Sequence, residues 1–315
     1  ASYEEVLMRG MPIPRYPGLK MGLPAKRTLG TLWSARRPDL VHIVTEGPLG
    51  WSALQAALKL RLPVTSDFRT NFHAYSSHYG IGWLQKPIAA YLRKFHNRTQ
   101  MTMVPTGWQR DMLAELGFRN LRVVARGVDT ALFHPARRDE ALRRAWGVAH
   151  DDIVVLHVGR IAPEKNLALL SAAFDAMRAV QPRLRLVMVG DGPAHEAMQQ
   201  RHPDAVFAGL RRGEDLAAHY ASADLFLFPS LTETFGNVVL EAMASGLAVL
   251  AFDCAAAAEH IRHEATGYAV PMGDETAYLQ TARDMARRGA TLRSIGRAAR
   301  ASAEALDWDA VVAGL

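Results

Sequence analysis

The stretch Phe228-Pro-Ser-Leu-Thr-Glu-Thr-Phe-Gly-Asn-Val-Val-Leu-Glu-Ala-Met-Ala-Ser-Gly246 decides how the fold of this chain is interpreted. It follows the apolar run 223–228, which is short and apolar enough to be a buried parallel strand. Beyond a loop, apolar residues recur at helical spacing over 238–243, and Gly246 is a typical helix end. A helix that starts near Gly236 presents unpaired N–H groups and the positive end of its dipole, so its start is suited to an anion.

Two carboxylates lie on either side of this helix start. Glu233 is in the loop, and Glu241 lies about 7.5 Å along the helix axis from Gly236, at roughly 1.5 Å per residue. At that distance Glu241 is placed to bind a ribose diol while the N–H groups of residues 235–238 bind phosphate, and Glu233 faces the group beyond the phosphate. This order of groups fits a nucleotide joined through phosphate to a polyol. Each carboxylate alone is explained as readily by the helix dipole or by solvation.

Length and composition indicate a globular chain of two domains. The 315 residues are 49% apolar and 22% charged. No apolar run reaches the length of a membrane-spanning helix, and the first residues carry no signal-peptide pattern. The single Cys254 cannot form an internal disulfide and is interpreted as a small buried residue. We therefore expect a cytoplasmic protein.

The charge differs between the two halves of the chain. Residues 1–148 carry 22 Lys/Arg and 10 Asp/Glu, a net charge of +12, whereas the remainder carries 15 and 21, a net charge of −6. Opposite signs support two domains. The basic half suggests an anionic partner: nucleic acid, a phosphorylated substrate or an acidic membrane surface.

Predicted strands and helices alternate twice along the chain. In the first half, strands are expected at 40–44, 63–68, 101–104 and 121–125, with helices at 25–35, 51–60, 83–98 and 107–116. Residues 10–18 are interpreted as an extended, proline-rich connector, and 126–135 as a linker. In the second half, strands are expected at 153–158, 184–189, 205–208, 223–228, 247–252 and 268–270, before a helical tail over 291–315. This alternation predicts two doubly wound parallel sheets.

Two cations and several glycines follow the first strand of the second half. In His157-Val-Gly-Arg-Ile-Ala-Pro-Glu-Lys-Asn166, Gly159 lets the chain turn close to a ligand, and Arg160 and Lys165 lie beside a helix expected to start near Asn166. Arginine can bind phosphate oxygens in a fork, and lysine acts as a point charge. The alternative is a pair of ordinary surface cations. Gly190-Asp-Gly-Pro193 is interpreted as a turn that shapes the edge of the same pocket.

The motif Glu233-x7-Glu241 resembles the signature of the retaining family 4 glycosyltransferases, which have the GT-B fold. The segment from Gly159 to Asn166 is similar to the motif whose Arg and Lys hold the donor pyrophosphate in that family. The resemblance implies an α/β protein in which two doubly wound, Rossmann-like domains face each other across a cleft. The implied parts are an acceptor-side domain at 1–145 that lacks its first strands, a nucleotide-sugar domain at 146–301, and a helix at 302–315 that crosses back, anchored by Trp308.

The resemblance also implies which residues bind the donor. Glu233 is expected to hold the hydroxyls of the transferred sugar in a catalytic role. No cofactor and no essential metal are expected, because Arg160 and Lys165 are expected to neutralise the leaving diphosphate. The expected donor-binding residues are Gly159, Arg160, Lys165, Gly209, Leu210, Phe235, Gly236, Asn237, Val238 and Glu241.

In the first half, Arg69 and His73 are the remaining catalytic candidates. Related enzymes often have Phe/Tyr-His-Thr where this chain has Phe68-Arg69-Thr70, so Arg69 replaces the expected histidine. Either Arg69 or His73 is expected against the sugar or its leaving phosphate. The helix over 83–98 has an apolar stripe and a basic face. It either lies on an anionic membrane or packs on the core, and packing is the commoner case.

The resemblance is greatest to bacterial mannosyltransferases and glycolipid-forming transferases. We therefore expect retaining transfer of a hexose, with GDP-mannose as the first choice of donor and a UDP-hexose as the second. The expected acceptor is a membrane lipid, reached from the inner face of the plasma membrane. Alternatives are a soluble GT-B enzyme with a small sugar acceptor, or a chain that binds donor without turnover. A basic nucleic-acid-binding protein would leave the phosphate and ribose residues unexplained, so no nucleic-acid partner is expected.

Overall fold

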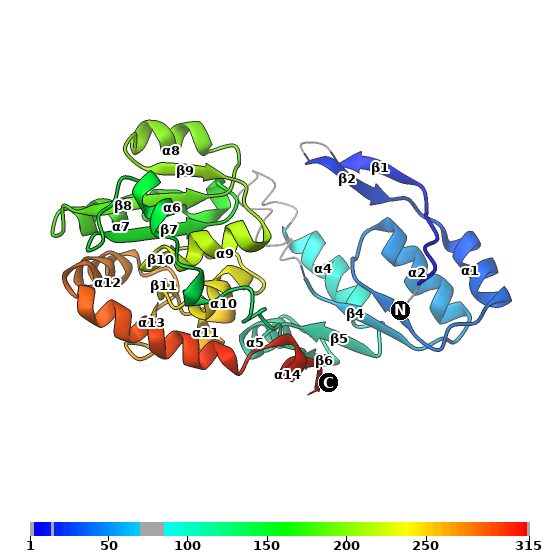
Figure 1. Ribbon diagram of the computed structural model, residues 1–315. Coiled ribbons are helices and arrows are strands. Elements are labelled where there is room, and N and C mark those ends of the chain that lie inside the picture. Colours follow the sequence, from blue (N-terminus) through cyan, green and yellow to red (C-terminus); the bar gives the residue numbers. More distant parts are fainter. Residues whose placement is uncertain (1–2, 14–15, 70–84, 314–315) are drawn as a thin grey trace. The chain divides into compact units, whose positions relative to one another are not determined.

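The computed structural model describes residues 3–13, 16–69 and 85–313, and the chain divides into two compact units between Val124 and Ala125 (Figure 1). The first unit contains a four-stranded parallel sheet in the order β3-β4-β5-β6, which is also the order along the chain. Its strands are β3 (Val41–Ile43), β4 (Val64–Asp67), β5 (Met101–Val104) and β6 (Leu121–Val123). Its helices are α1 (Lys26–Ala35), α2 (Pro48–Lys59), α4 (Gln85–His96) and α5 (Gly107–Glu115).

The N-terminal segment forms a hairpin where only an extended connector was expected. Strands β1 (Gly10–Ile13) and β2 (Tyr16–Gly22) pair antiparallel, with Met11 opposite Met21 and Pro12 opposite Lys20. Proline cannot donate to a sheet, so the prolines here concealed the strand pattern. A two-stranded ribbon accommodates them because both of its strands are edge strands.

The second unit contains a six-stranded parallel sheet in the order β12-β11-β10-β7-β8-β9. Read from β9, this is the 3-2-1-4-5-6 order of a doubly wound dinucleotide-binding fold. Strands β10 and β11 are buried along their whole length, as expected for a parallel sheet with helices on both faces (Figure 1). The strands are β7 (Ile153–Val158), β8 (Leu184–Val189), β9 (Val206–Gly209), β10 (Leu225–Phe228), β11 (Ala248–Phe252) and β12 (Tyr268–Val270).

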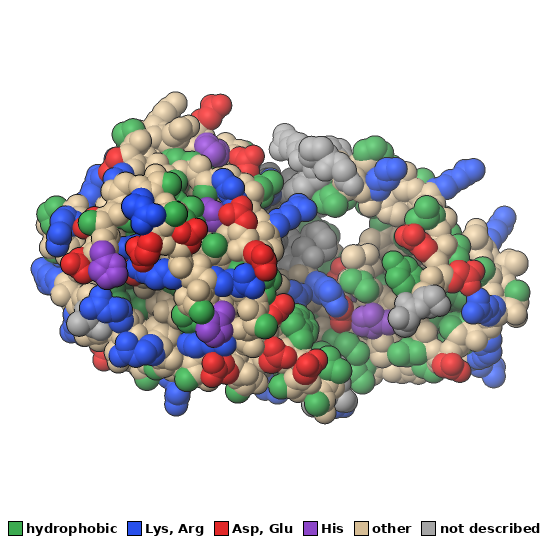
Figure 2. Space-filling view, viewed as in Figure 1, with side chains coloured by type: hydrophobic (Ala, Val, Ile, Leu, Met, Phe, Trp, Pro, Cys, Tyr) green, Lys and Arg blue, Asp and Glu red, His purple; other side chains and the backbone are tan. Residues whose placement is uncertain are grey.

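Helices connect these strands and continue to the end of the chain. Acidic and basic side chains are interspersed over the visible face of this unit, so its excess of carboxylates forms no single patch there (Figure 2). The helical segments are η2 (Pro135–Arg137), α6 (Glu140–Ala145), η3 (Pro163–Lys165), α7 (Leu167–Arg178), α8 (His195–Arg201), α9 (Gly213–Ala221), α10 (Asn237–Ala244), α11 (Ala255–His260), α12 (Glu275–Arg287), α13 (Gly289–Glu304) and α14 (Trp308–Ala313).

Residues 125–145 pack with the second unit, although the expected domain boundary was at 145. Phe133 and Trp146 belong to the second unit's hydrophobic core. The Arg143 side chain is 1% exposed and binds Asp224 Oδ2 at 3.1 Å and the Ser222 carbonyl at 2.8 Å. Residues 126–135 have the composition of a linker, but Phe133 packs them with the second unit, and Arg143 and Trp146 do the same for the residues that follow.

The C-terminal helix α14 contacts the start of the second unit. Val128 and Asp307 form a bridge, and Thr130 Oγ1 donates to Asp307 Oδ2 at 3.2 Å. A Cβ on Gly127 would lie 2.8 Å from the Trp308 backbone, so this glycine permits the close approach. Passage of the helix to the first domain stays a prediction.

Helix α4 packs its apolar stripe on the core of the first unit. Leu92 and Phe95 are 2% and 0% exposed, and the Tyr91 hydroxyl donates to the Glu46 carbonyl. Leu92 and Phe95 of the stripe are therefore packed on the core, which agrees with the packing alternative. Within the described ranges, no helix is both long and apolar enough to cross a membrane.

Candidate active site

The two predicted motifs follow neighbouring strands of the second sheet. β7 leads into the loop that holds residues 159–166, and β10 leads into the loop that holds residues 229–236. These strands pair in parallel, and the direction of the strand order reverses between them. In open α/β sheets, ligands bind at the carboxyl ends of the strands at such a switch point. The fold therefore brings both motifs to the place where a ligand is expected.

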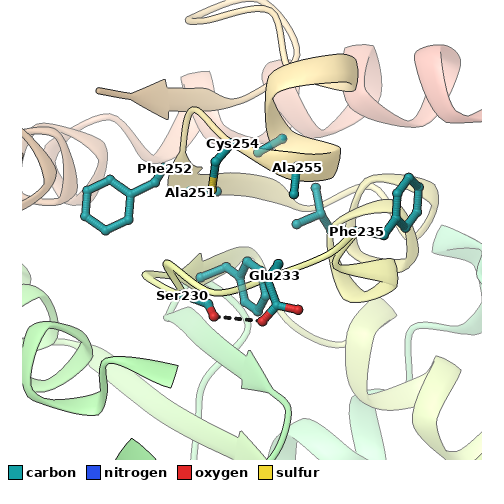
Figure 3. A pocket seen from close by; sticks show the side chains of 10 residues that line it. Ser230, Glu233, Phe235, Ala251, Phe252, Cys254 and Ala255 are labelled. Atoms are coloured by element: carbon teal, nitrogen blue, oxygen red, sulfur yellow. Dashed lines mark hydrogen bonds between the residues drawn. The ribbon is translucent and has the colours of Figure 1, made fainter. Parts of the chain in front are cut away.

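Lys165 and Glu233 form an ion pair between the two loops. Lys165 Nζ contacts Glu233 Oε1, and Ser230 Oγ donates to the same oxygen at 2.7 Å (Figure 3). The two charged side chains are 15% and 13% exposed, so water screens their attraction only in part. The cation expected at the diphosphate and the carboxylate expected at the sugar are therefore in contact. Ser230 was not predicted, since a serine after a strand carries no specific signal.

Arg160 is held by a buried carboxylate. Its Nη1 lies 3.1 Å from Glu164 Oε1, and the side chains of Arg160 and Glu164 are 37% and 3% exposed. Asn166 then adopts the left-handed conformation with φ 53°, and α7 starts at Leu167, as the sequence predicted. Glu164 was not among the predicted site residues. Its position inside the motif was visible, but its pairing with Arg160 was not.

The Gly159 loop and the Gly190 loop are joined by their backbones. Gly159 N donates to the Val189 carbonyl at 3.0 Å, and Ile161 N donates to the Asp191 carbonyl at 3.0 Å. A Cβ on Gly190, whose φ is 135°, would lie 1.9 Å from the Gly159 carbonyl oxygen. Only glycine permits this approach. The turn at 190–193 therefore fixes the loop that carries Arg160.

The start of α10 is fixed on both of its sides. Gly236 is in a left-handed conformation with φ 87°, and the Phe235 carbonyl accepts a hydrogen bond from Ala256 N at 2.9 Å. The Arg126 guanidinium lies 5.7 Å from the centre of the Phe235 ring, and its Nη1 donates to Asn237 Oδ1 at 3.3 Å. The helix begins at Asn237, as predicted. Arg126 adds a positive charge near this helix start.

Glu241 is largely buried and has one protein partner that the sequence did not reveal. The Tyr220 hydroxyl donates to Glu241 Oε2 at 2.8 Å. Burial raises the pKa of Glu241, and the hydrogen bond from Tyr220 opposes that rise. Tyr220 lies in α9 and was not among the predicted site residues.

Gly209 and Leu210, two of the expected donor-binding residues, lie at the end of β9. Gly209 has φ 70°, and its carbonyl accepts a hydrogen bond from Gly190 N at 2.9 Å. The next residue, Leu210, is 71% exposed. Backbone groups and an apolar side chain are therefore available at this strand end, which is tied to the Gly190 loop.

His157 lies beneath the two loops. Its Nδ1 is 3.1 Å from the Leu227 carbonyl oxygen, which can only accept, so Nδ1 carries the proton and donates. The ring is fully buried, and Nε2 has no hydrogen-bond partner among the residues that the structure describes. Burial lowers the pKa of His157 to about 4, which keeps the ring neutral.

The buried ring makes the fold sensitive to acid. The folded-state pKa of about 4 is below the usual histidine pKa of 6.5, so protons favour the unfolded chain and stability falls as the pH drops below 6.5. The free energy of unfolding falls between pH 7 and pH 5, and we expect this fall to be smaller by about 2 kcal/mol in His157→Asn. The asparagine amide nitrogen can replace Nδ1–H as the donor. Urea unfolding at both pH values measures this loss. An equal loss in the variant and the unsubstituted protein would contradict the assignment.

In the first unit, Arg69 lies at the carboxyl end of β4. Its guanidinium pairs with Asp67 Oδ2, which is also 3.4 Å from His42 Nε2. The side chains of Asp67 and Arg69 are 8% and 54% exposed. Arg69 is therefore oriented by a buried carboxylate at a sheet edge suited to ligands. The other candidate, His73, lies outside the described residues.

A small pocket lies behind the Glu233 loop. Ser230, Glu233, Phe235 and Cys254 line it, and its volume of about 10 Å³ has room for about one water molecule (Figure 3). Cys254 is buried, as expected, and burial raises its thiol pKa to about 12. Among the described residues, no three His, Cys, Asp or Glu side chains are grouped as metal ligands.

Comparison with known proteins gives the family. A sequence profile described as "Glycosyl transferases group 1" matches residues 152–288, and one described as "Glycosyltransferase Family 4" matches residues 2–132. The chain is 36% identical over 261 residues to the GDP-mannose-dependent alpha-mannosyltransferase of Mycobacterium tuberculosis, covering 83% of this chain and 67% of the relative. It is 29% identical over 226 residues to the alpha-monoglucosyldiacylglycerol synthase of Streptococcus pneumoniae, covering 68% of this chain and 51% of that relative.

A solved structure shares the fold. The chain resembles Anabaena HepE, solved in complex with UDP and glucose, with a TM-score of 0.73 and 21% identity over 91% of this chain and 78% of the other. This likeness and the two parallel α/β units confirm the predicted GT-B fold. With both profiles and the mannosyltransferase likeness in agreement, the chain belongs to glycosyltransferase family 4.

Proposed function

We propose that the protein transfers a hexose from a nucleotide-sugar to an acceptor, with retention of configuration at the anomeric carbon. The contact between Lys165 and Glu233 supports this proposal most. It joins a cation suited to a leaving diphosphate with a carboxylate suited to sugar hydroxyls, beside a helix start suited to phosphate. Mannose from GDP-mannose is the first choice, because a relative at 36% identity carries that donor in its name.

The chemical requirement is stabilisation of the departing diphosphate and of positive charge on the sugar ring. Arg160, Lys165 and the N-terminus of α10 supply fixed positive charge for the diphosphate. In this scheme these groups neutralise the leaving group without a divalent metal. Glu233 accepts hydrogen bonds from sugar hydroxyls, and Glu241 accepts them from the ribose. The leaving phosphate removes the acceptor proton.

The ion pair also indicates how donor binding rearranges the site. Without donor, Lys165 is neutralised by Glu233. An incoming diphosphate competes for Lys165, and its greater negative charge favours the exchange. Glu233 remains held by Ser230 and becomes available to the sugar. One movement of a lysine side chain therefore engages both ends of the donor.

Donor binding tests the proposal. We expect GDP-mannose to bind saturably in calorimetric titration, more tightly than UDP-glucose or UDP-galactose, and Glu241→Ala to abolish binding. Glu196→Ala, at an exposed glutamate on α8, is the matched control and should bind as the unsubstituted chain does. Preference for a UDP-sugar would keep the enzyme class and replace the donor. Binding to none of the three would contradict the proposal.

We propose a membrane lipid as the acceptor, reached at the inner face of the plasma membrane. Residues 1–148 carry a net charge of +12, and one relative is named for a product built on diacylglycerol. Sugar should then pass from the donor to diacylglycerol in vesicles that contain anionic lipid, and the protein should sediment with them. Transfer to a free sugar without sedimentation would favour the small-sugar alternative.

A further inference from the structure

Tyr220 links the core of the second unit to Glu241. The tyrosine is fully buried, and its ring lies edge-on to Phe133 at 5.6 Å and tilted against Phe226 at 5.8 Å. These rings come from the 125–135 segment and from β10, so packing on two sides fixes the direction of the phenol. Its hydroxyl donates to Glu241 Oε2 at 2.8 Å.

This hydrogen bond occupies one oxygen of the carboxylate. A carboxylate has two oxygens with about four acceptor positions, so Oε1 keeps its capacity to accept from a ligand. A glutamate side chain has three rotatable bonds, and an anchored Oε2 restricts them before a ligand arrives. A preorganised acceptor binds more tightly because less side-chain freedom is lost on binding.

The buried hydroxyl needs an explanation beyond packing. Phenylalanine would fill the same space between the rings of Phe133 and Phe226 without burying a polar group. A buried hydroxyl without a partner is unfavourable, whereas a hydrogen bond to a charged group is worth more than a neutral one. The tyrosine hydroxyl is therefore suited to holding Glu241 as an anion.

We propose that Tyr220 is a positioning residue, which anchors the Glu241 carboxylate so that its second oxygen receives the ribose hydroxyls of the nucleotide. This inference rests on the proposed function, in which Glu241 binds ribose. Tyr220 itself touches no substrate. The 125–135 segment takes part through Phe133, which holds the tyrosine ring.

The test replaces the hydroxyl alone. Tyr220→Phe should weaken GDP binding in calorimetry by about ten- to a hundredfold, the value of a hydrogen bond to a charged group. It should leave the Kd of 2′,3′-dideoxy-GDP unchanged, because that nucleotide lacks the hydroxyls that Glu241 receives. The matched control is Tyr278→Phe, at another fully buried tyrosine, whose hydroxyl donates to the Leu250 carbonyl at 3.1 Å. In the control, the ratio of the Kd of GDP to the Kd of 2′,3′-dideoxy-GDP should be the same as in the unsubstituted protein.

The pH dependence of binding gives a second readout. Burial raises the pKa of Glu241 and the Tyr220 hydroxyl opposes this, so Tyr220→Phe raises the pKa further. Binding needs the carboxylate and is lost as the pH falls through this pKa. The pH at which GDP affinity falls to half should therefore be higher in the variant. Two other titratable side chains lie around α10 and have partners of their own. Arg300 of α13 donates to the Ala244 carbonyl, and His260 of α11 lies against Phe235.

The outcomes separate this inference from the proposed function. Equal weakening of GDP and dideoxy-GDP by Tyr220→Phe, with no change in the pH profile, means that Tyr220 has a structural role only and overturns the inference. Unchanged GDP affinity also overturns it, while nucleotide binding by the unsubstituted protein still supports the proposed function. If the unsubstituted protein prefers UDP, the same ratio is measured with UDP and its dideoxy form. If it binds neither nucleotide, both proposals fail.

Discussion

Replacement of Lys165 by methionine is expected to lower kcat for sugar transfer by about 10²- to 10³-fold. This is the usual effect of removing one group that stabilises the charge developing on the leaving group in the transition state. Methionine keeps most of the length of the side chain and removes its charge. The lysine is 15% exposed, so water replaces the lost charge only in part. Steady-state kinetics with the donor identified by calorimetry measures the effect. Lys59→Met, at an exposed lysine on α2, is the control and should retain full activity.

A second substitution separates catalysis from stability. Lys165→Met leaves Glu233 partly buried without its cation, so the melting temperature should fall as well as the activity. Adding Glu233→Gln removes the unpaired charge and should restore much of the melting temperature while kcat stays low. Recovery of activity in the double variant would contradict the roles proposed for both Lys165 and Glu233.

Gly190→Ala should unfold the edge of the donor site. The added methyl would lie 1.9 Å from the Gly159 carbonyl oxygen, and φ at this residue is 135°, a region that is essentially restricted to glycine. We expect the free energy of unfolding to fall by at least about 3 kcal/mol and nucleotide binding to be lost, because the Gly159 loop must move. Urea unfolding and calorimetry measure the two effects.

Gly273→Ala is the matched control for this substitution. Gly273 also has a positive φ, 81°, but no atom of the described part of the chain lies within 4 Å of the position its Cβ would take. Only backbone strain acts there, so the loss of stability should be about 1 kcal/mol and nucleotide binding should be unchanged. Equal effects at Gly190 and Gly273 would contradict the close contact between the two loops.

The second sheet and the two loops that carry the candidate site could be predicted because their signals are local. Each buried strand is a short apolar run, and the segments 157–166 and 228–246 combine glycine with charged residues after such runs. Both segments follow strands whose carboxyl ends lie at one edge of the parallel sheet, where ligands bind in such folds. Their contact as an ion pair depends on side-chain packing across the sheet, which no spacing reveals.

The features that the sequence did not reveal depend on distant contacts. Tyr220 is 21 residues from Glu241, and a tyrosine in a predicted helix carries no signal for such a contact. The β1–β2 hairpin is the exception, because it is local, but its prolines concealed its strand pattern. The boundary was misplaced because residues 126–135 have the composition of a turn, whereas Phe133 and Arg143 decide their packing.

The packing of residues 125–146 also determines where the chain can be cut to produce its second part alone. Arg300 Nη1 donates to the carbonyls of Thr130, Phe133 and Ala244, so this segment is fastened to α13 and to the end of α10. A fragment that begins at residue 125 keeps these bonds. One that begins at 146 loses the ring that holds Tyr220 and leaves Asp224 without Arg143. A shorter fragment would therefore be less stable, and its ribose carboxylate would be poorly oriented.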